Sequence, residues 1–256
     1  MMMKKNIETD IASASLLNRL KEEMNVGLKG GIYHLTQIKF CYNSNRIEGS
    51  RLSEDQTRYI YDTNTVNAVD GETLNIDDII ETINHFACFK FLLATATELL
   101  SENIIKEYHR ILKTGTLDSQ KDWFVVGDYK KLENMVGGAK TTLPKNVSHE
   151  MNKLLKNYNQ QNTHTINDII TFHHTFESIH PFQDGNGRVG RLILFKECVK
   201  NNIVPFIIEE KHKLYYYRGL KEYKKTPMYL IDTCLSAQDS YKELLKYYKI
   251  PFAEND

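Results

Sequence analysis

In its last third, the chain reads His180-Pro181-Phe182-Gln183-Asp184-Gly185-Asn186-Gly187-Arg188-Val189-Gly190-Arg191. Asp-Gly-Asn-Gly favours a tight turn, because glycine and asparagine tolerate positive φ angles. The residues that follow, 188–199, contain no proline and are rich in helix formers. We therefore expect a buried helix that begins near Asn186 or Gly187.

This turn and helix predict an anion site. A glycine-rich turn that enters a helix leaves several backbone N–H groups unpaired, and the helix dipole adds positive potential there. Arg188 and Arg191 are three residues apart and share one face of the first turn. Two cations at a helix N-terminus oppose the dipole and each other, so an anion between them relieves the conflict. Guanidinium groups suit phosphate oxygens in geometry.

Two further side chains in the segment suit phosphate chemistry. Asp184 precedes the turn and can hold a divalent cation against phosphate oxygens. His180 lies outside the helix because Pro181 follows it, and imidazole is the usual general base near neutral pH. We expect Phe182 to point into the core and anchor the loop. Each piece alone is common in ordinary turns and core corners, and only their combination in this order favours a phosphate site.

The segment resembles the signature of the Fic family, His-x-Phe-x-(Asp/Glu)-Gly-Asn-Gly-Arg-x-x-Arg, and matches every specified position. The resemblance implies a mostly all-α fold, a helical bundle with a small β-hairpin flap. It also implies an enzyme that transfers the AMP part of ATP to a hydroxyl group of a protein target, with Mg²⁺ at the site. Some relatives with altered signatures are kinases or use other donors, so the intact Gly-Asn-Gly-Arg favours AMP transfer.

The resemblance assigns roles to residues of the segment. His180 is the base that deprotonates the target hydroxyl, and Asp184 is the Mg²⁺ ligand. The asparagine and the glycine amides hold the inner phosphates, and the two arginines contact the outer ones. The implied nucleotide-binding residues are Phe182, Gly185, Asn186, Gly187, Arg188 and Arg191.

A second resemblance lies far upstream. Ser44-Asn45-Arg46-Ile47-Glu48-Gly49 is similar to the family's inhibitory motif, (Ser/Thr)-x-x-x-Glu-(Gly/Asn), whose residues here are Ser44, Glu48 and Gly49. In relatives the glutamate pairs with the second signature arginine, which is Arg191 in this chain. A carboxylate on Arg191 would deny that side chain to the γ-phosphate and repel ATP. Glu-Gly is also an ordinary helix end, because glycine is preferred after a helix. The position of the motif before the core implies the class with an N-terminal inhibitory helix.

The composition excludes some partners. Lys+Arg and Asp+Glu both number 33, so no global charge favours nucleic acid or a membrane surface. The four cysteines form no Cys-x-x-Cys pair, which indicates reduced thiols in a cytoplasmic protein. No apolar run approaches about 18 residues, so we expect neither a signal peptide nor a membrane span. The expected partner is a protein with a Tyr, Ser or Thr hydroxyl, the chain itself included, and an exposed helix face could build a homodimer.

Most of the chain predicts helix. We expect a helical extension at 1–29, a Fic domain at 30–205 and a C-terminal helical extension at 206–256, whose role no motif specifies. The inhibitory helix occupies about 35–49 and the flap about 122–143. Ser53 resembles the first residue of a capping box that opens a short helix. Further helices are expected at 12–24, 35–47, 76–100, 103–113, 147–158, 167–179, 211–223 and 227–248.

Residues 122–143 are the exception, because 123–129 and 134–138 are typical of extended segments with turns. Relatives have a β-hairpin flap after Gly-x-(Tyr/Trp)-Arg, whereas this chain has Lys130 at the position of the arginine. Such a flap docks the target by strand-like pairing of main chains. An ordinary surface hairpin is the alternative. The candidate docking residues are Gly127, Tyr129, Val136 and Gly137.

Other histidines and tyrosines favour structural roles. We interpret His109 as structural, and the spacing of His173 and His174 does not suit a zinc site. The cluster 215–218, Tyr-Tyr-Tyr-Arg, has the aromatic and basic character of a nucleic-acid surface, but a packing helix face with solvent-exposed Tyr tips is the favoured interpretation.

Three functions remain open at this stage. The leading hypothesis is an autoinhibited protein adenylyltransferase. The second is an enzyme that removes AMP at the same site, with Glu48 positioning water. The third is a nucleotide-sensing binding module that has lost transfer.

Overall fold

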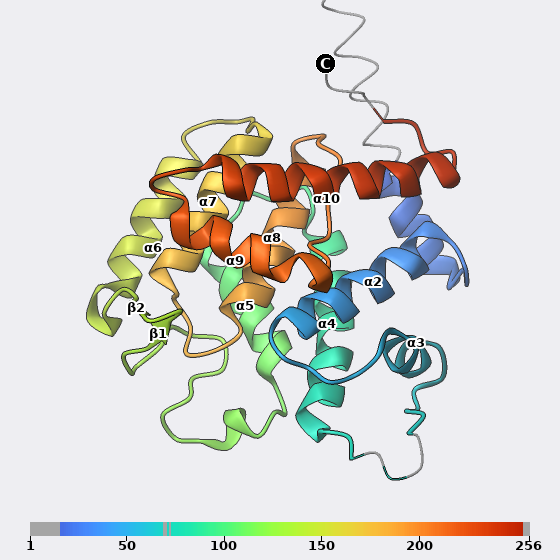
Figure 1. The fold of residues 1–256 in the computed structure, drawn as a ribbon, viewed down its shortest axis with the longest axis horizontal. Helices are drawn as coiled ribbons and strands as arrows, with labels where there is room; N and C mark the ends of the chain where they lie inside the picture. Colours follow the sequence, from blue (N-terminus) through green and yellow to red (C-terminus); the bar gives the residue numbers. More distant parts are fainter. Residues whose placement is uncertain (1–15, 69–70, 72, 253–256) are drawn as a thin grey trace, which may run out of the picture.

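The computed structural model describes residues 16–68, 71 and 73–252. The fold is mostly helical with one small hairpin, which confirms the predicted fold class (Figure 1). Residues 16–26 are helical, and the start of the helix predicted at 12–24 lies outside the described residues. The elements that follow are α2 (Ile32–Ile47), α3 (Glu54–Thr63), α4 (Ile76–Ala94), α5 (Glu102–Lys113), η1 (Asp118–Gln120), β1 (Met135–Val136), β2 (Ala139–Lys140), α6 (Pro144–Tyr158), α7 (Ile166–Ile179), α8 (Asn186–Lys200), η2 (Glu210–His212), α9 (Lys213–Glu222) and α10 (Met228–Tyr247).

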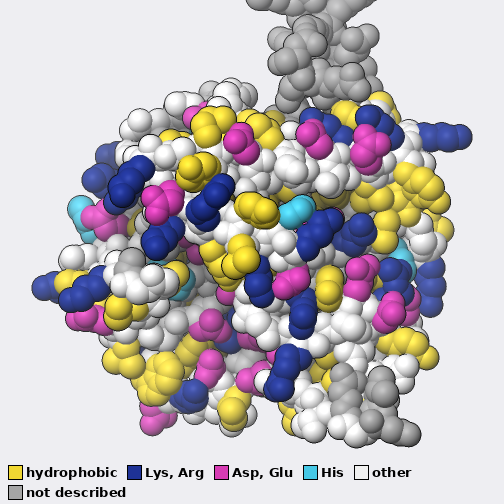
Figure 2. Space-filling view, in the orientation of Figure 1, with side chains coloured by type: hydrophobic (Ala, Val, Ile, Leu, Met, Phe, Trp, Pro, Cys, Tyr) yellow, Lys and Arg dark blue, Asp and Glu magenta, His cyan; other side chains and the backbone are white. Residues whose placement is uncertain are grey.

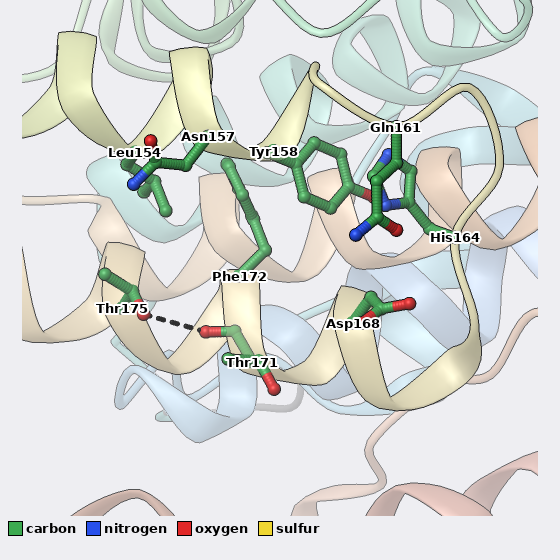
Figure 3. Close-up of a pocket in the computed structure, with 9 residues that line it drawn as sticks. All are labelled: Leu154, Asn157, Tyr158, Gln161, His164, Asp168, Thr171, Phe172 and Thr175. Atoms are coloured by element: carbon green, nitrogen blue, oxygen red, sulfur yellow. Dashed lines mark hydrogen bonds between the residues drawn. The ribbon is translucent and has the colours of Figure 1, made fainter.

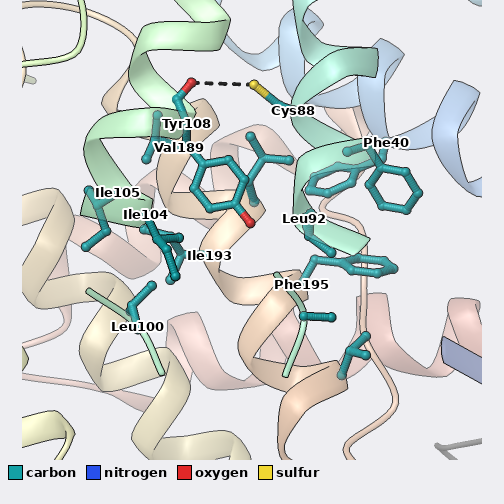
Figure 4. Packing of buried hydrophobic residues seen from close by; sticks show 14 of the residues in the cluster. Phe40, Cys88, Leu92, Leu100, Ile104, Ile105, Tyr108, Val189, Ile193 and Phe195 are labelled. Atoms are coloured by element: carbon teal, nitrogen blue, oxygen red, sulfur yellow. Dashed lines mark hydrogen bonds between the residues drawn. The ribbon is translucent and has the colours of Figure 1, made fainter. Parts of the chain in front are cut away.

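The core is built around α8, the helix that follows the signature turn. It is buried on all sides, since 13 of its 15 residues are inaccessible. Its neighbours include α7, α4, α5 and α2. Figure 4 shows Val189, Ile193 and Phe195 of α8 against Phe40 of α2 and Tyr108 of α5. Because α8 is buried on all sides, the signature turn at its N-terminus lies at one end of the bundle.

Most predicted helices are present, with ends shifted by a few residues, but the prediction for 76–100 is wrong at its C-terminal end. Helix α4 stops at Ala94, where the Thr95 hydroxyl donates to the Phe91 carbonyl at 2.9 Å. Ser101 then caps α5, accepting from the amide of Ile104. The apolar periodicity continues through this turn because Ala96 and Leu100 are buried in the core without being helical. The predicted capping box at Ser53 is confirmed.

The hairpin is smaller than the sequence predicted. Strands β1 and β2 are antiparallel, with Val136 opposite Ala139. Gly137 and Gly138 form the turn, both with positive φ. Residues 123–129, predicted to be extended with turns, contain turns and a bend but no strand. Gly127 has φ 77°, and its amide donates to His109 Nδ1 instead of to a strand.

The C-terminal helices α9 and α10 pack against each other and lie beside α2 and α7 (Figure 1). On the face that they share, positive and negative side chains are interspersed (Figure 2). No helix among the described residues is long and apolar enough to cross a membrane.

Candidate active site

The signature loop is held in shape by Asn186. His180 ends α7 in the left-handed region, with φ 53°. Asn186 Oδ1 accepts from the Phe182 amide at 2.8 Å, and Asn186 Nδ2 donates to the Phe182 carbonyl at 2.9 Å. The Asn186 side chain is buried and closes the loop, and its contact with phosphate stays a prediction. Gly185, with φ 80°, is the N-cap of α8, so the loop amides lie at the start of that helix.

Phe182 anchors the loop in the core, as predicted. Its side chain is fully buried and stacks on His109, with ring centroids 4.0 Å apart. Burial lowers the pKa of His109 to about 3, so the ring is neutral and accepts from Gly127. His109 is therefore structural.

His180 has the geometry of a neutral base. Burial, followed by the nearby Lys130 charge, lowers its pKa to about 4. Its Nδ1 lies 3.3 Å from the carbonyl of Glu177. With the proton on Nδ1, Nε2 keeps its lone pair and can accept a proton.

Asp184 is part of a network of charged side chains that includes Lys113, Arg188 and Glu81. Its Oδ2 lies 2.7 Å from Lys113 Nζ and 3.2 Å from Arg188 Nη2. Glu81 of α4 completes the network, 2.6 Å from Lys113 and also paired with Arg188. Burial opposes the charge on Asp184, but Arg188 and Lys113 outweigh it and lower its pKa. The carboxylate is therefore ionised at neutral pH.

This arrangement fits a magnesium site that is completed by substrate. The Asp184 side chain is 46% exposed, whereas those of Lys113 and Arg188 are buried. Mg²⁺ commonly binds one or two carboxylates together with substrate phosphates. Within the described ranges no three His, Cys, Asp or Glu side chains form a metal cluster, His173 and His174 included.

The predicted pair of Arg191 and Glu48 is present. Arg191 Nη2 donates to Glu48 Oε1 at 2.7 Å and to the Ser44 carbonyl at 2.9 Å. Its Nε donates to Ser44 Oγ at 3.0 Å. A Cβ on Gly187 would lie only 2.2 Å from Glu48 Oε1, so a glycine is required for the carboxylate to reach the arginine. Gly49 follows Glu48 with φ 103° and ends the helix.

A polar layer lies behind Arg191. His173 Nε2 is 2.7 Å from the Tyr216 hydroxyl, and the Arg191 guanidinium carbon is 5.9 Å from the centre of the Tyr216 ring. Burial raises the pKa of Glu177 to about 8, although the Arg191 charge acts in the opposite direction. A Cβ on Gly190 would lie 2.4 Å from Glu177 Oε1 and 2.9 Å from the His173 ring. Gly190 therefore allows α7 to approach α8 closely beside Arg191.

Comparison with known proteins agrees with this geometry. Residues 99–197 match the model of the Fic/DOC family. The chain carries a Fic/DOC family domain. It is 30% identical over 191 residues to the protein adenylyltransferase Fic of Aedes aegypti. The aligned residues make up 72% of this chain and 36% of that protein. Against the protein adenylyltransferase Fic of Drosophila persimilis it is 27% identical over 215 residues, 82% of this chain and 38% of that protein. The chain thus spans little more than a third of these curated relatives.

Solved structures show the same fold. A Fic domain containing signaling protein from Bacteroides thetaiotaomicron superposes with a TM-score of 0.71 at 21% identity, over 94% of this chain and 99% of that one. Fic-1 from C. elegans superposes with a TM-score of 0.68 at 20% identity, over 96% of this chain and 74% of that one.

The flap of this Fic domain is tied to the signature loop. The Lys130 amide donates to the Pro181 carbonyl at 2.9 Å, and Asn134 Nδ2 donates to the Phe182 carbonyl at 3.1 Å. Lys130 Nζ donates to Asn134 Oδ1 and Thr141 Oγ1, both at 2.7 Å. Lys130, which replaces the family's usual arginine, thus joins the two sides of the flap.

The four candidate docking residues differ in exposure. Val136 is 44% exposed at the hairpin tip, next to Gly137. Tyr129 packs toward the core, with its ring 5.8 Å from that of Phe182. Gly127 lies against Arg110, where a Cβ would be 2.9 Å from the Arg110 Cβ. Only the hairpin tip therefore presents an open surface.

Sequence reasoning missed several residues of the site: Glu81, Lys113, Glu177 and Tyr216. They come from α4, α5, α7 and α9, and only Glu177 lies within a few residues of the signature. The one available signal was the position of Lys113 in the last turn of a helix, which suits the dipole but does not indicate a site. A separate pocket between α6 and α7, lined by Tyr158, His164 and Phe172 among others, contains none of the signature residues (Figure 3).

Proposed function

We propose that this protein is an autoinhibited protein adenylyltransferase that uses ATP and Mg²⁺. The observation that carries the proposal is the contact of Arg191 with Glu48 and Ser44 within a complete signature. The curated relatives are named protein adenylyltransferases, which supports the same reaction class. The target is a protein with a Tyr, Ser or Thr hydroxyl.

The proposed reaction begins at His180. Its Nε2 takes the proton of the target hydroxyl, and the oxygen attacks the α-phosphorus of ATP. The bond from that phosphorus to the bridging oxygen of the β-phosphate breaks, and pyrophosphate leaves with the bond's electron pair. Transfer of this kind depends on positioning and charge stabilisation more than on covalent chemistry by the protein.

Other groups of the site hold the phosphates. Asp184 would hold Mg²⁺, which would neutralise phosphate charge when bound. The amides at Gly185 and Gly187 lie at the N-terminal end of α8, where anions are favoured. Arg188 is held toward Asp184, so its charge acts at the metal side of the site.

The proposed inhibition acts through Arg191. While Glu48 occupies this side chain, the outer phosphates lose their cation and face a carboxylate instead. ATP would then bind in an unproductive position.

The four cysteines are buried and unpaired, which supports our placement of the protein in the reducing cytoplasm.

The test compares the protein with its Glu48→Gly and His180→Ala variants, each incubated with an ATP analogue tagged on the α-phosphate side. Loss of a charged hydrogen bond corresponds to a change of about tenfold or more, so Glu48→Gly should increase self-labelling by at least that factor. His180→Ala should abolish labelling in either background. Equal labelling of all three proteins would contradict the mechanism.

The same variants separate the other hypotheses. Release of AMP from an adenylylated target that requires Glu48 would show the reverse reaction. ATP binding without any transfer from the Glu48→Gly protein would show a binding module.

A further inference from the structure

The C-terminal segment, residues 206–252, is hydrogen-bonded to α2 along the whole length of that helix. Contacts occur just before the N-terminal end of the helix, in its first half, near its C-terminal end and at its last residue. The four hydrogen bonds are Tyr248 OH to the Gly30 carbonyl (2.6 Å), Thr36 Oγ1 with Tyr241 OH (2.9 Å), the Glu210 amide to Asn43 Oδ1 (2.8 Å) and Tyr217 OH to the Ile47 carbonyl (2.9 Å).

The last of these bonds lies next to the inhibitory pair. Ile47 is the final residue of α2 and precedes Glu48 directly. Carbonyls in the last turn of a helix lack a partner within the helix, and Tyr217 supplies a donor to this one. The bond therefore fixes the point from which the Glu48 side chain extends toward Arg191.

Helix α9 lies beside Arg191 and beside the residue that precedes Glu48. Tyr216 is buried beside the guanidinium of Arg191, and Tyr217 holds the backbone beside Glu48. The two tyrosine rings are 5.7 Å apart. Burial, with the charge of Glu48 next, raises the pKa of Tyr217 to about 12. The hydroxyl therefore keeps its proton at neutral pH and remains a donor.

We propose that Tyr217 is a positioning residue that keeps Glu48 on Arg191, and that the C-terminal helices thereby form part of the autoinhibitory apparatus. This inference rests on the proposed function, in which Glu48 is the inhibitory group. It assigns a role to a segment for which the sequence motifs specify none.

Removing the Tyr217 hydroxyl should have a local and moderate effect on the position of Glu48. One neutral hydrogen bond corresponds to a change of about 2- to 10-fold in an equilibrium. The other three bonds and the buried residues Ile38 and Phe40 still hold the rest of α2. Loss of the hydroxyl should therefore loosen only the end of the helix.

The experiment uses Tyr217→Phe, Glu48→Gly, the double variant and Tyr215→Phe as the matched control. Tyr215 lies on the same helix, but its ring contacts His212 and Arg218 of its own segment. Two readouts are taken on the full chain: hydrogen–deuterium exchange of the amides in residues 44–50, and self-labelling with the α-tagged ATP analogue. Melting temperatures verify that each variant is folded.

We expect Tyr217→Phe to increase exchange of residues 44–50 and self-labelling by about 2- to 10-fold, with no change in Tyr215→Phe. In the Glu48→Gly background the same substitution should not raise labelling further, because the group that it positions is gone.

Unchanged exchange in Tyr217→Phe would overturn the inference, as would an equal rise in labelling with and without Glu48. The proposed function fails separately. If Glu48→Gly transfers no AMP but Tyr217→Phe still accelerates exchange and strengthens ATP binding, the positioning role stands without the reaction. If Glu48→Gly is active and Tyr217→Phe matches wild type in both readouts, only the inference is lost.

Discussion

At the scale of single residues, His180 illustrates how the environment of the site changes an ordinary side chain. A free histidine is half protonated near pH 6.5. In this protein, burial and the Lys130 charge lower the pKa of His180 to about 4, so the ring is neutral over the whole physiological range. The proposed base therefore needs no activating carboxylate to be neutral.

The pH dependence of transfer follows from this pKa. In the Glu48→Gly protein we expect kcat/KM to be flat between about pH 5 and 7 and to fall only at about pH 4 or below, because only the neutral ring accepts a proton and the Glu48 charge that raises the pKa of His180 is gone. Lys130→Met should move this acid limb to higher pH but leave it below 6.5, since burial is the larger cause. If kcat/KM of the Glu48→Gly protein that retains Lys130 fell near pH 6.5, the prediction would be contradicted. Circular dichroism must show that this protein is folded.

The packing of α7 against α8 requires a glycine at position 190. In Gly190→Ala the new Cβ would overlap with Glu177 Oε1 and the His173 ring. We expect a loss of about 1–3 kcal/mol in the free energy of unfolding, measured by denaturant titration. Combination with Glu177→Ala should recover part of that loss, because the closest atom is removed. Wild-type stability of the single variant would show that α7 and α8 are free to separate.

At the scale of elements, the flap depends on the loop that it covers. Its two short strands contribute few hydrogen bonds, and Asn134 supplies the connections to Phe182, Lys130 and Thr141. The flap position is therefore decided by side-chain contacts to the signature loop more than by strand pairing.

Asn134→Ala tests this dependence. We expect trypsin to cleave after Lys131 and Lys140 several-fold faster in the variant, because the flap opens more often when the bonds of the Asn134 side chain are lost. The melting temperature should change little, because Met135 and Val136 of the hairpin are exposed and lie outside the hydrophobic core. Thr163→Ala, outside the flap, serves as the control. Equal cleavage rates in wild type and Asn134→Ala would mean that other contacts hold the flap.

At the scale of the whole molecule, α8 combines the signature with the most deeply buried ion pair. Lys196 and Glu197 are both inaccessible, with Lys196 Nζ 2.9 Å from Glu197 Oε1 and 2.7 Å from the Glu98 carbonyl. Tyr158 donates to the other carboxylate oxygen. This network joins α8 to α6 and to the turn after α4, away from the catalytic end.

Removal of one partner of the Lys196–Glu197 pair should lower the free energy of unfolding substantially. Lys196→Met leaves Glu197 as a buried carboxylate without its main counter-charge, and we expect a loss of about 3–5 kcal/mol in unfolding free energy. Adding Glu197→Gln should restore part of it by removing the isolated charge. Guanidinium titration monitored by circular dichroism measures both. A loss under about 1 kcal/mol would indicate that water reaches the pair.

The sequence by itself determined most of the helices and placed the candidate site in the signature segment. Helix periodicity and capping signals are local, so most helices and the start of α8 could be predicted. The signature and the inhibitory motif predicted the pairing of Glu48 with Arg191, which the structure contains. The end of α4 was misjudged, because burial of Ala96 and Leu100 continues the apolar pattern where the backbone turns.

Only the tertiary structure decided which residues surround the signature. Lys113 and Glu81 meet Asp184 because α4 and α5 pack side by side against α8. Tyr217 reaches the end of α2 because α9 lies across it, 170 residues away in the chain. No local pattern encodes such contacts, since they arise from how buried helix faces fit together. For this reason the sequence predicted the chemistry of the site, whereas its ion network and the support of the proposed inhibitory helix became visible only in the packed molecule.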